Sequence, residues 1–149
     1  MKTFNNIINA LKQIVTEHKL LGSENYFFGE PFDFRTVNKS MPQIIIQPIP
    51  FSINKEVITY KLRLSYIDIL DSDLTNLQDV YSDSIQTLND ILNKLEYDEN
   101  FLDEYFLNYN ITFNNFQFKY DELTAGHWID IEIETSRIDN TCVSPFFLK

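Results

Sequence analysis

Hydrophobic residues recur at steps of three and four positions in two stretches of this sequence, which is the spacing of one face of an α-helix. The first stretch follows Thr3, a residue type that often caps helices, and stops before Gly22, so a helix is predicted near residues 3–21. The second follows an acidic turn and predicts a long helix over residues 73–96. Both predicted helices are amphipathic and need a hydrophobic surface to pack against.

Alternation of hydrophobic and polar residues, the pattern of a half-buried β-strand, is clearest over residues 56–68 and returns over residues 127–135. Residues 111–120 also alternate, but the hydrophobic positions change parity near residue 114, which predicts a bulge or bend. Residues 121–126 have the composition of a turn. The last two strands are therefore predicted to form an antiparallel hairpin.

Two shorter strands are predicted over residues 25–28 and 43–47. Two prolines follow the second strand, and a proline lacks the amide hydrogen that a central strand must donate. We therefore expect an irregular exit from this strand, within an extended loop near residues 30–56. Residues 97–108 mix acidic and aromatic side chains, a pattern that fits a short helical turn or an extended connection equally well.

These elements occur in the order α-β-β-β-α-β-β, which predicts an α+β fold with a mainly antiparallel sheet and two amphipathic helices. The chain has 149 residues, the length of one domain, and no repeat or linker divides it. We therefore predict a single domain over residues 1–149, with an irregular C-terminal tail over residues 139–149.

The charge balance argues against nucleic-acid binding, because 22 acidic residues outnumber 12 basic ones and give a net charge of -10. The longest apolar runs, such as residues 44–46, are far too short to cross a bilayer, and no signal sequence is evident at the N-terminus. Cys142 is the single cysteine, so no internal disulfide forms. We expect a protein of a reducing compartment that does not contact membranes.

Candidates for catalysis are scarce. His18 lies at the end of the first predicted helix, where a histidine is favourable beside the last carbonyl groups. His127 opens a strand next to Gly126, where a packed or edge position is expected. Neither histidine has companions at metal-ligand spacing, and no local motif joins Cys142 to either one. The sequence predicts no enzyme activity and no metal site.

Aspartates between residues 68 and 79 suggest a calcium loop at first sight. Counting from Asp71, however, places Asn76 where an EF-hand requires glycine and Ser82 where it requires glutamate. We interpret these aspartates as helix-capping residues. Because the chain has only 3 glycines, no phosphate-binding loop can be assembled and no nucleotide cofactor is predicted.

Three carboxylates share one face of the last predicted strand at two-residue spacing: Asp130, Glu132 and Glu134. Like charges this close stay ionised only where the face meets water, so an acidic solvated surface is expected. It is either an ordinary polar outer face or a surface that meets a polyanion without holding it. In a ring with this face inward, DNA could slide through a negative channel.

The strand EVITYKLRLSYIDI, the helix DSDLTNLQDVYSDSIQTLNDILNKL and the closing hairpin ITFNNFQFKYDELTAGHWIDIEIE together resemble the tail-terminator and head-tail joining proteins of tailed bacteriophages. The likeness is one of architecture and spans most of the chain. That family has no invariant catalytic or binding motif, so no single residue carries a role over. The resemblance implies a small α+β subunit of a ring around the channel through which DNA leaves the capsid. It also implies a virion protein of the tail or neck, assembled in the host cytoplasm beside portal, connector or tail proteins.

A ring contact of this kind joins two different surfaces of each subunit. Candidate contact residues are Phe51 in the proline-rich loop, and Pro145, Phe146 and Phe147 in the C-terminal tail. Their apolar side chains need an internal groove or a neighbouring subunit.

The sequence therefore predicts a non-enzymatic structural protein that forms a homo-oligomeric ring and lines or seals a DNA channel without a cofactor. Two other hypotheses stay open. One is a small α+β enzyme or ligand-binding domain, with a carboxylate such as Asp130 in a pocket between sheet and helices. The other is an adaptor that binds one protein partner through a surface rich in phenylalanine and tyrosine.

Overall fold

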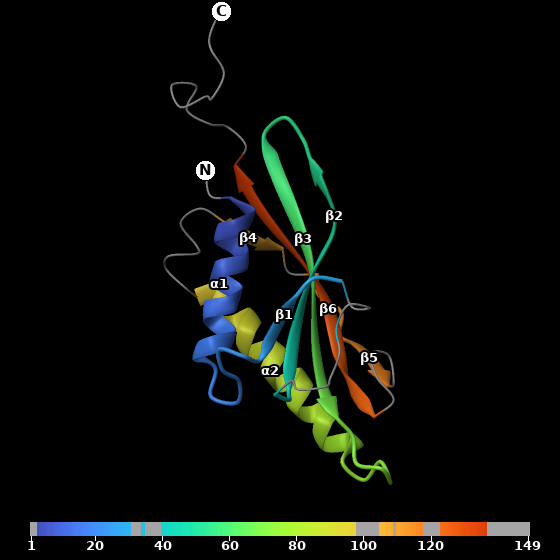
Figure 1. Cartoon of the computed structure of the whole chain (residues 1–149). Coiled ribbons are helices and arrows are strands. Elements are labelled where there is room, and N and C mark those ends of the chain that lie inside the picture. The colour runs from blue at the N-terminus through green and yellow to red at the C-terminus, as the bar shows by residue number, and fades with distance from the viewer. Residues whose placement is uncertain are drawn as a thin grey trace, which may run out of the picture.

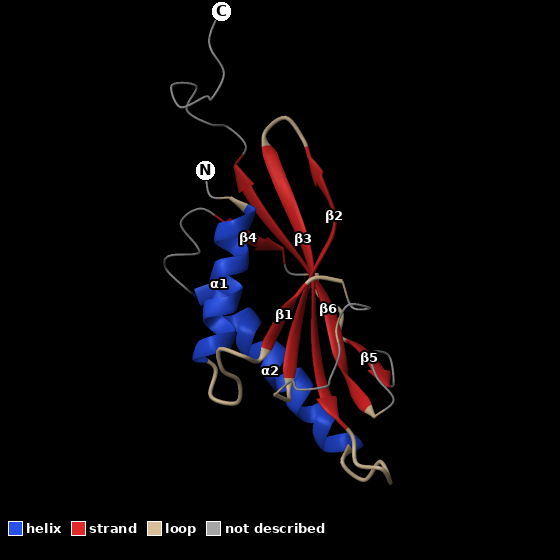
Figure 2. Cartoon of the chain, in the orientation of Figure 1, coloured by secondary structure: helices blue, strands red, loops and turns tan. Residues whose placement is uncertain are grey.

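The computed structural model describes residues 3–30, 34, 40–97, 105–108, 110–117 and 123–136. Two helices cover one face of a six-stranded sheet (Figure 1, Figure 2). In chain order the elements are α1 (Phe4–Glu17), β1 (Tyr26–Phe28), β2 (Gln43–Ile53), β3 (Val57–Ile69), α2 (Leu77–Tyr97), β4 (Tyr105–Asn108), β5 (Asn114–Gln117) and β6 (Thr124–Ser136). The predicted α+β class is confirmed.

The strand order is β1-β2-β3-β6-β4, and β5 also pairs with β6. Only β1 and β2 are parallel, so the sheet is mainly antiparallel, as predicted. The strand β4 comes from the stretch for which the sequence left helix and extended chain open. It pairs with residues 132–135 of β6, whereas β5 pairs with residues 125–128. One long strand, β6, thus has two short partners along the edge that β3 does not occupy.

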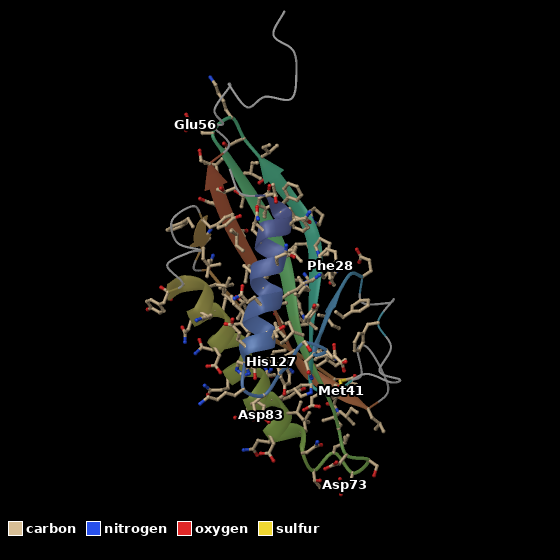
Figure 3. All side chains as sticks on the ribbon, turned by 60° about the vertical axis from the view of Figure 1, so that its left-hand side comes forward. Phe28, Met41, Glu56, Asp73, Asp83 and His127 are labelled. Carbon is tan, nitrogen blue, oxygen red and sulfur yellow. The ribbon has the colours of Figure 1, made fainter. Side chains whose placement is uncertain are left out.

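Strand β2 extends farther than the sequence predicted. It runs through Pro48 and Pro50 to Ile53 and stays paired with β3, so the predicted exit into a loop after residue 47 was wrong. Strands β2 and β3 form a long hairpin that projects past the helices (Figure 1). Figure 3 shows Glu56 in the hairpin turn at one end of the molecule.

The prolines fit because this part of β2 is an edge. Strand β1 pairs only with residues 44–46. The amide of Ile44 donates to the carbonyl of Asn25 at 2.9 Å, so the even-numbered residues of β2 direct their backbone groups away from β3. Pro48 therefore faces the free edge, and its missing amide hydrogen leaves the ladder between β2 and β3 intact.

A β-bulge near the end of β2 changes the face of the sheet on which its last side chains lie. The pairing with β3 shifts between Ile49 and Ser52, so that two residues of β2 face one residue of β3. The extra residue reverses the faces that the following side chains occupy. Phe51 and Ile53 therefore lie on the helix side of the sheet, and the Phe51 ring centroid is 5.2 Å from that of Tyr60.

The main core lies between the sheet and the two helices. Alternate residues of β3 and β6 face it, as their sequence alternation predicted. Its fully buried members include Ile7 and Leu11 from α1, Leu62 and Leu64 from β3, Leu88, Ile91 and Leu95 from α2, and Ile129, Ile131 and Ile133 from β6.

A smaller core lies on the opposite side of the sheet, which we call the open face. Phe34, Ile45, Ile67 and Phe116 form it, and Trp128 packs against it. Phe34, which lies between β1 and β2 in the sequence, is fully buried in this smaller core. The remainder of the open face, toward the hairpin, carries polar and charged side chains.

The strand β5 shows the predicted change of face. Ile111 and Phe113 pack against the main core, whereas Phe116 belongs to the smaller core on the open face. The strand itself begins only at Asn114, and it pairs with β6 in the antiparallel hairpin that was predicted.

Both helices differ from prediction at one end. Thr3 caps α1 as expected: its hydroxyl oxygen accepts from the amide of Asn6, and its own amide donates to Oδ1 of Asn6. However, α1 ends at Glu17 rather than near residue 21. Helix α2 begins at residue 77 rather than 73. The residues before it form a turn, in which the carboxylate of Asp73 accepts hydrogen bonds from the amide and hydroxyl of Thr75.

Candidate functional site

The three carboxylates singled out from the sequence lie on the open face of β6, where alternation predicted them. That face also carries the two basic side chains of β3. The register pairs Asp130 with Arg63, Glu132 with Lys61 and Glu134 with Thr59. Each of the first two acids therefore has a base directly across the ladder.

Arg63 holds Asp130 in a two-pronged ion pair. Its Nε donates to Oδ1 at 2.7 Å and its Nη2 donates to Oδ2 at 3.1 Å. The guanidinium also lies over the ring of Trp128, 3.9 Å from the ring centroid. Both oxygens of the Asp130 carboxylate are bound to this guanidinium, which Trp128 also holds in place. Asp130 is therefore not a free acid or base.

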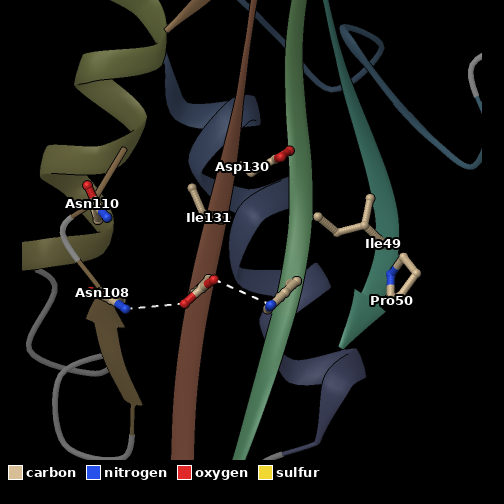
Figure 4. A pocket seen from close by; sticks show the side chains of 8 residues that line it. Ile49, Pro50, Asn108, Asn110, Asp130 and Ile131 are labelled. Carbon is tan, nitrogen blue, oxygen red and sulfur yellow. Dashed lines mark hydrogen bonds and ion pairs between the residues drawn. The ribbon is translucent and has the colours of Figure 1, made fainter. Parts of the chain in front are cut away.

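A second polar link joins three strands. The Nζ atom of Lys61 lies 3.5 Å from Oε1 of Glu132, and the Nδ2 atom of Asn108 donates to Oε2 at 3.2 Å (Figure 4). Lys61 comes from β3, Glu132 from β6 and Asn108 from β4. Glu134 differs from the other two acids: within the described residues it has no ion pair. Its partner across the ladder to β4 is Phe106, whose side chain is exposed.

These side chains line a shallow cavity of about 350 Å³ on the open face, shown in Figure 4. Its lining residues are Ile49, Pro50, Lys61, Asn108, Asn110, Asp130, Ile131 and Glu132. The ligand-binding hypothesis placed a pocket containing Asp130 between the sheet and the helices. The cavity that Asp130 lines is instead on the other side of the sheet. Its charged groups are bonded to one another, which favours a structural role.

Among the residues that the structure describes, a larger excess of acidic side chains lies elsewhere, over the end of β3, the turn after it and α2. Residues 68–97 hold seven acidic side chains and one basic one, a net -6 of the chain's -10. They are Asp68, Asp71, Asp73, Asp79, Asp83, Asp90, Glu96 and Lys94. Burial raises the pKa of Asp68, and the nearby charge of Asp83 raises it further.

His127 is buried between α2 and the sheet, as one of the two expected alternatives had it. Its Nδ1 atom is hydrogen-bonded to Oγ of Ser84, and the ring of Tyr81 lies edge-on at 5.0 Å. The Ser84 hydroxyl has one hydrogen and donates it to the carbonyl of Tyr81 at 2.8 Å. His127 therefore donates to Ser84, which is the reverse of what a general base beside a serine nucleophile requires.

His18 is the C-cap of α1, at the helix end where the sequence placed it. Its ring nitrogens have other partners: Nε2 bonds to Oδ2 of Asp90 on α2 at 2.9 Å, and Nδ1 accepts from the amide of Leu20 at 3.1 Å. The accepting Nδ1 identifies the tautomer that carries its hydrogen on Nε2. This link joins the end of α1, where His18 adopts an extended backbone, to α2.

Of the predicted contact residues, the structure describes Phe51, whose side chain is exposed near the end of β2. Pro145, Phe146 and Phe147 lie outside the described residues, as does Cys142. Sequence reasoning missed the apolar residue next to Phe51 on the hairpin, Ile53. The parity change that exposes both residues comes from the bulge, and a bulge beside prolines leaves no periodic signal.

The comparisons with known proteins bring no relative: the sequence matches no family model and no curated protein. Across the described residues, no group of three or more His, Cys, Asp or Glu side chains is arranged to hold a metal ion. Neither α1 nor α2 combines the length and apolar character needed to cross a membrane.

Proposed function

We propose that this protein is a non-enzymatic structural subunit of a homo-oligomeric ring in the tail or head-tail connector of a tailed bacteriophage. The observation that carries the proposal is the projecting β2–β3 hairpin. Phe51 and Ile53, near its end, are 54% and 57% exposed. Strand β6 pairs with β3 as far as the hairpin turn, so the projecting part is a supported platform, and the exposed apolar residues on it favour contact with another molecule.

The contact proposed for the hairpin uses side chains rather than sheet extension. The free edge of β2 carries Pro48 and Pro50, and prolines on an edge strand discourage pairing with a further strand. A neighbour would meet the helix-side face of the hairpin, where Phe51 and Ile53 lie. The contact is heterologous, as a closed ring requires, because a different surface of the neighbour must cover this face.

Net acidity fits the passage of DNA without binding. Pairing of Asp130 and Glu132 with Arg63 and Lys61 weakens the negative potential of the β6 stripe. The surface of α2 and the preceding turn has a larger unbalanced negative charge. We therefore infer that the α2 surface, rather than the β6 stripe, faces the DNA.

Light scattering over a concentration series tests the proposal, with electron microscopy of the native particle as the second measurement. The wild-type chain is expected to assemble as concentration rises, and F51S/I53S to assemble at least tenfold less readily. The control L20S replaces an exposed apolar residue that lies off the hairpin, and should behave as wild type. A protein that stays monomeric at every concentration, and forms no symmetric ring in the particle, would overturn the proposal.

A further inference from the structure

A row of four aromatic rings leads from β1 to the end of the hairpin. Phe28 lies 6.4 Å from Phe4, Phe4 lies 5.6 Å from Tyr60, and Tyr60 lies 5.2 Å from Phe51, all between ring centroids. The two outer rings, Phe28 and Phe51, are 40% and 54% exposed. We call these four residues the aromatic row. Ile53, on the same face, extends it toward the hairpin turn.

The chain leaves the sheet close to this row. Strand β6 ends at Ser136, which pairs with Val57 beside the hairpin turn. Ile53 pairs with Ile58, and Ile58 pairs with Thr135. Thr135 therefore lies about 10 Å from Ile53, which is two strand spacings, and β6 ends one residue later.

The segment that follows β6 has the length and composition to cover the row. Residues 137–149 number thirteen and reach about 45 Å when extended, which exceeds the length of the row. Their apolar members are Ile138, Val143, Pro145, Phe146, Phe147 and Leu148. These are side chains of the kind that bury exposed phenylalanine rings.

The direction of β6 favours the row of another copy. Strand β6 runs toward the hairpin turn, and Tyr60, the neighbour of Phe51, pairs with Ile133. The chain has therefore passed the level of Phe51 by three residues when it leaves β6 at Ser136. A straight continuation leads away from the row of its own subunit.

We propose that residues 137–149 of each subunit lie along the aromatic row of the next subunit. This inference rests on the proposed ring, in which it names the two unlike surfaces that meet: the C-terminal segment on one side and the aromatic row on the other. Repeated around the ring, each subunit gives one segment and receives one.

Crosslinking through the native Cys142 distinguishes the next subunit from the same one. In the full-length variant I53C, mild oxidation is expected to join Cys142 to the new thiol of a neighbour and give a ladder of covalent multimers on a non-reducing gel. I53C/C142S should lose the ladder, and N93C, with its cysteine on the exposed side of α2, should not form it. A fast-moving monomer linked within one chain, or no crosslink at all, would overturn the inference.

Mixing two variants provides the second readout. F51S lacks the centre of the accepting face and F146S/F147S lacks the anchors of the segment, so each is expected to assemble about tenfold or more less readily than wild type. An equimolar mixture should form a one-to-one complex, because one partner keeps its segment and the other keeps its row. If both variants assemble like wild type, the segment inference is wrong while the ring stands. If the wild type itself never assembles, the ring proposal is the one that fails.

Discussion

The buried histidine His127 makes the stability of the fold depend on pH. Its side chain is 7% exposed, and burial lowers its pKa below the ordinary value of 6.5. In the unfolded chain the ring is solvated and takes up a proton near pH 6.5. Below that pH the unfolded state binds more protons than the folded state, so acid favours unfolding. The contribution of His127 to stability is complete above pH 6.5 and is lost as the pH falls through its folded pKa.

The magnitude follows from proton linkage. If the folded ring stays neutral at pH 5.5, one pH unit below the unfolded pKa, the loss is at most about 1.4 kcal/mol. Asp68 acts in the opposite sense, because its pKa is higher in the folded protein than the value of 3.8 in the unfolded chain. Its contribution to stability is complete below pH 3.8 and is lost as the pH rises through the folded pKa. A comparison between pH 7.5 and 5.5, made against a variant that keeps Asp68, isolates the histidine.

Urea unfolding of a monomeric sample at the two pH values measures the effect. The parent is H18N, in which His127 is the remaining histidine of the 2 in the chain, and H18N/H127N is its partner. Asparagine can place an amide near the position of Nδ1 and does not titrate. The free energy of unfolding of H18N should fall by up to about 1.4 kcal/mol more than that of the double variant. Equal losses in the two proteins would refute the assignment of a depressed pKa to His127.

Three further predictions concern single contacts. G126A should lower the free energy of unfolding in urea by at least about 2 kcal/mol, because the added Cβ would lie 1.8 Å from the carbonyl oxygen of Tyr66. An unchanged unfolding midpoint would contradict this close approach of β3 and β6. R63M keeps the aliphatic stem but leaves Asp130 unpaired, so its free energy of unfolding should be about 1 kcal/mol lower than that of the wild type at low salt, with a smaller difference in 1 M NaCl. A difference that does not depend on salt would argue against the ion pair. Leu74 has φ 62°, so L74G should be at least as stable as wild type in thermal unfolding and L74V less stable; the reverse order would contradict the left-handed backbone.

The sequence predicted best those elements in which the spacing of hydrophobic residues depends only on which side chains are buried. In β3 and β6 every second side chain faces the main core, and α2 buries one stripe, so the periodicity reported both the element and its orientation. Predictions failed where a distant element decides the outcome. Helix α1 ends at Glu17, and the next residue, His18, bonds to Asp90, which is 72 positions away and carries no local signal in the sequence. Strand β2 continues through Pro48 because β1 is too short to cover that edge.

The open face shows why a charge pattern identifies a surface but not its electrostatics. Alternation alone places Asp130, Glu132 and Glu134 together on one face of one strand. Their potential depends on which strand lies alongside, and Arg63 meets Asp130 across 67 positions of sequence. A different strand order would leave the same stripe unpaired and strongly negative.

The same argument bears on function. A charged face whose members bond to one another presents little net field, so it neither attracts nor repels a polyanion strongly. A face of unbalanced charge does repel, and among the described residues the strongest excess lies on α2 and the turn before it. If DNA passes beside this protein, neutralising acids on α2, as in D79N/D83N, should increase the retention of the assembled ring on DNA at low salt. Neutralising the paired residues together, as in R63Q/D130N, should leave that retention unchanged.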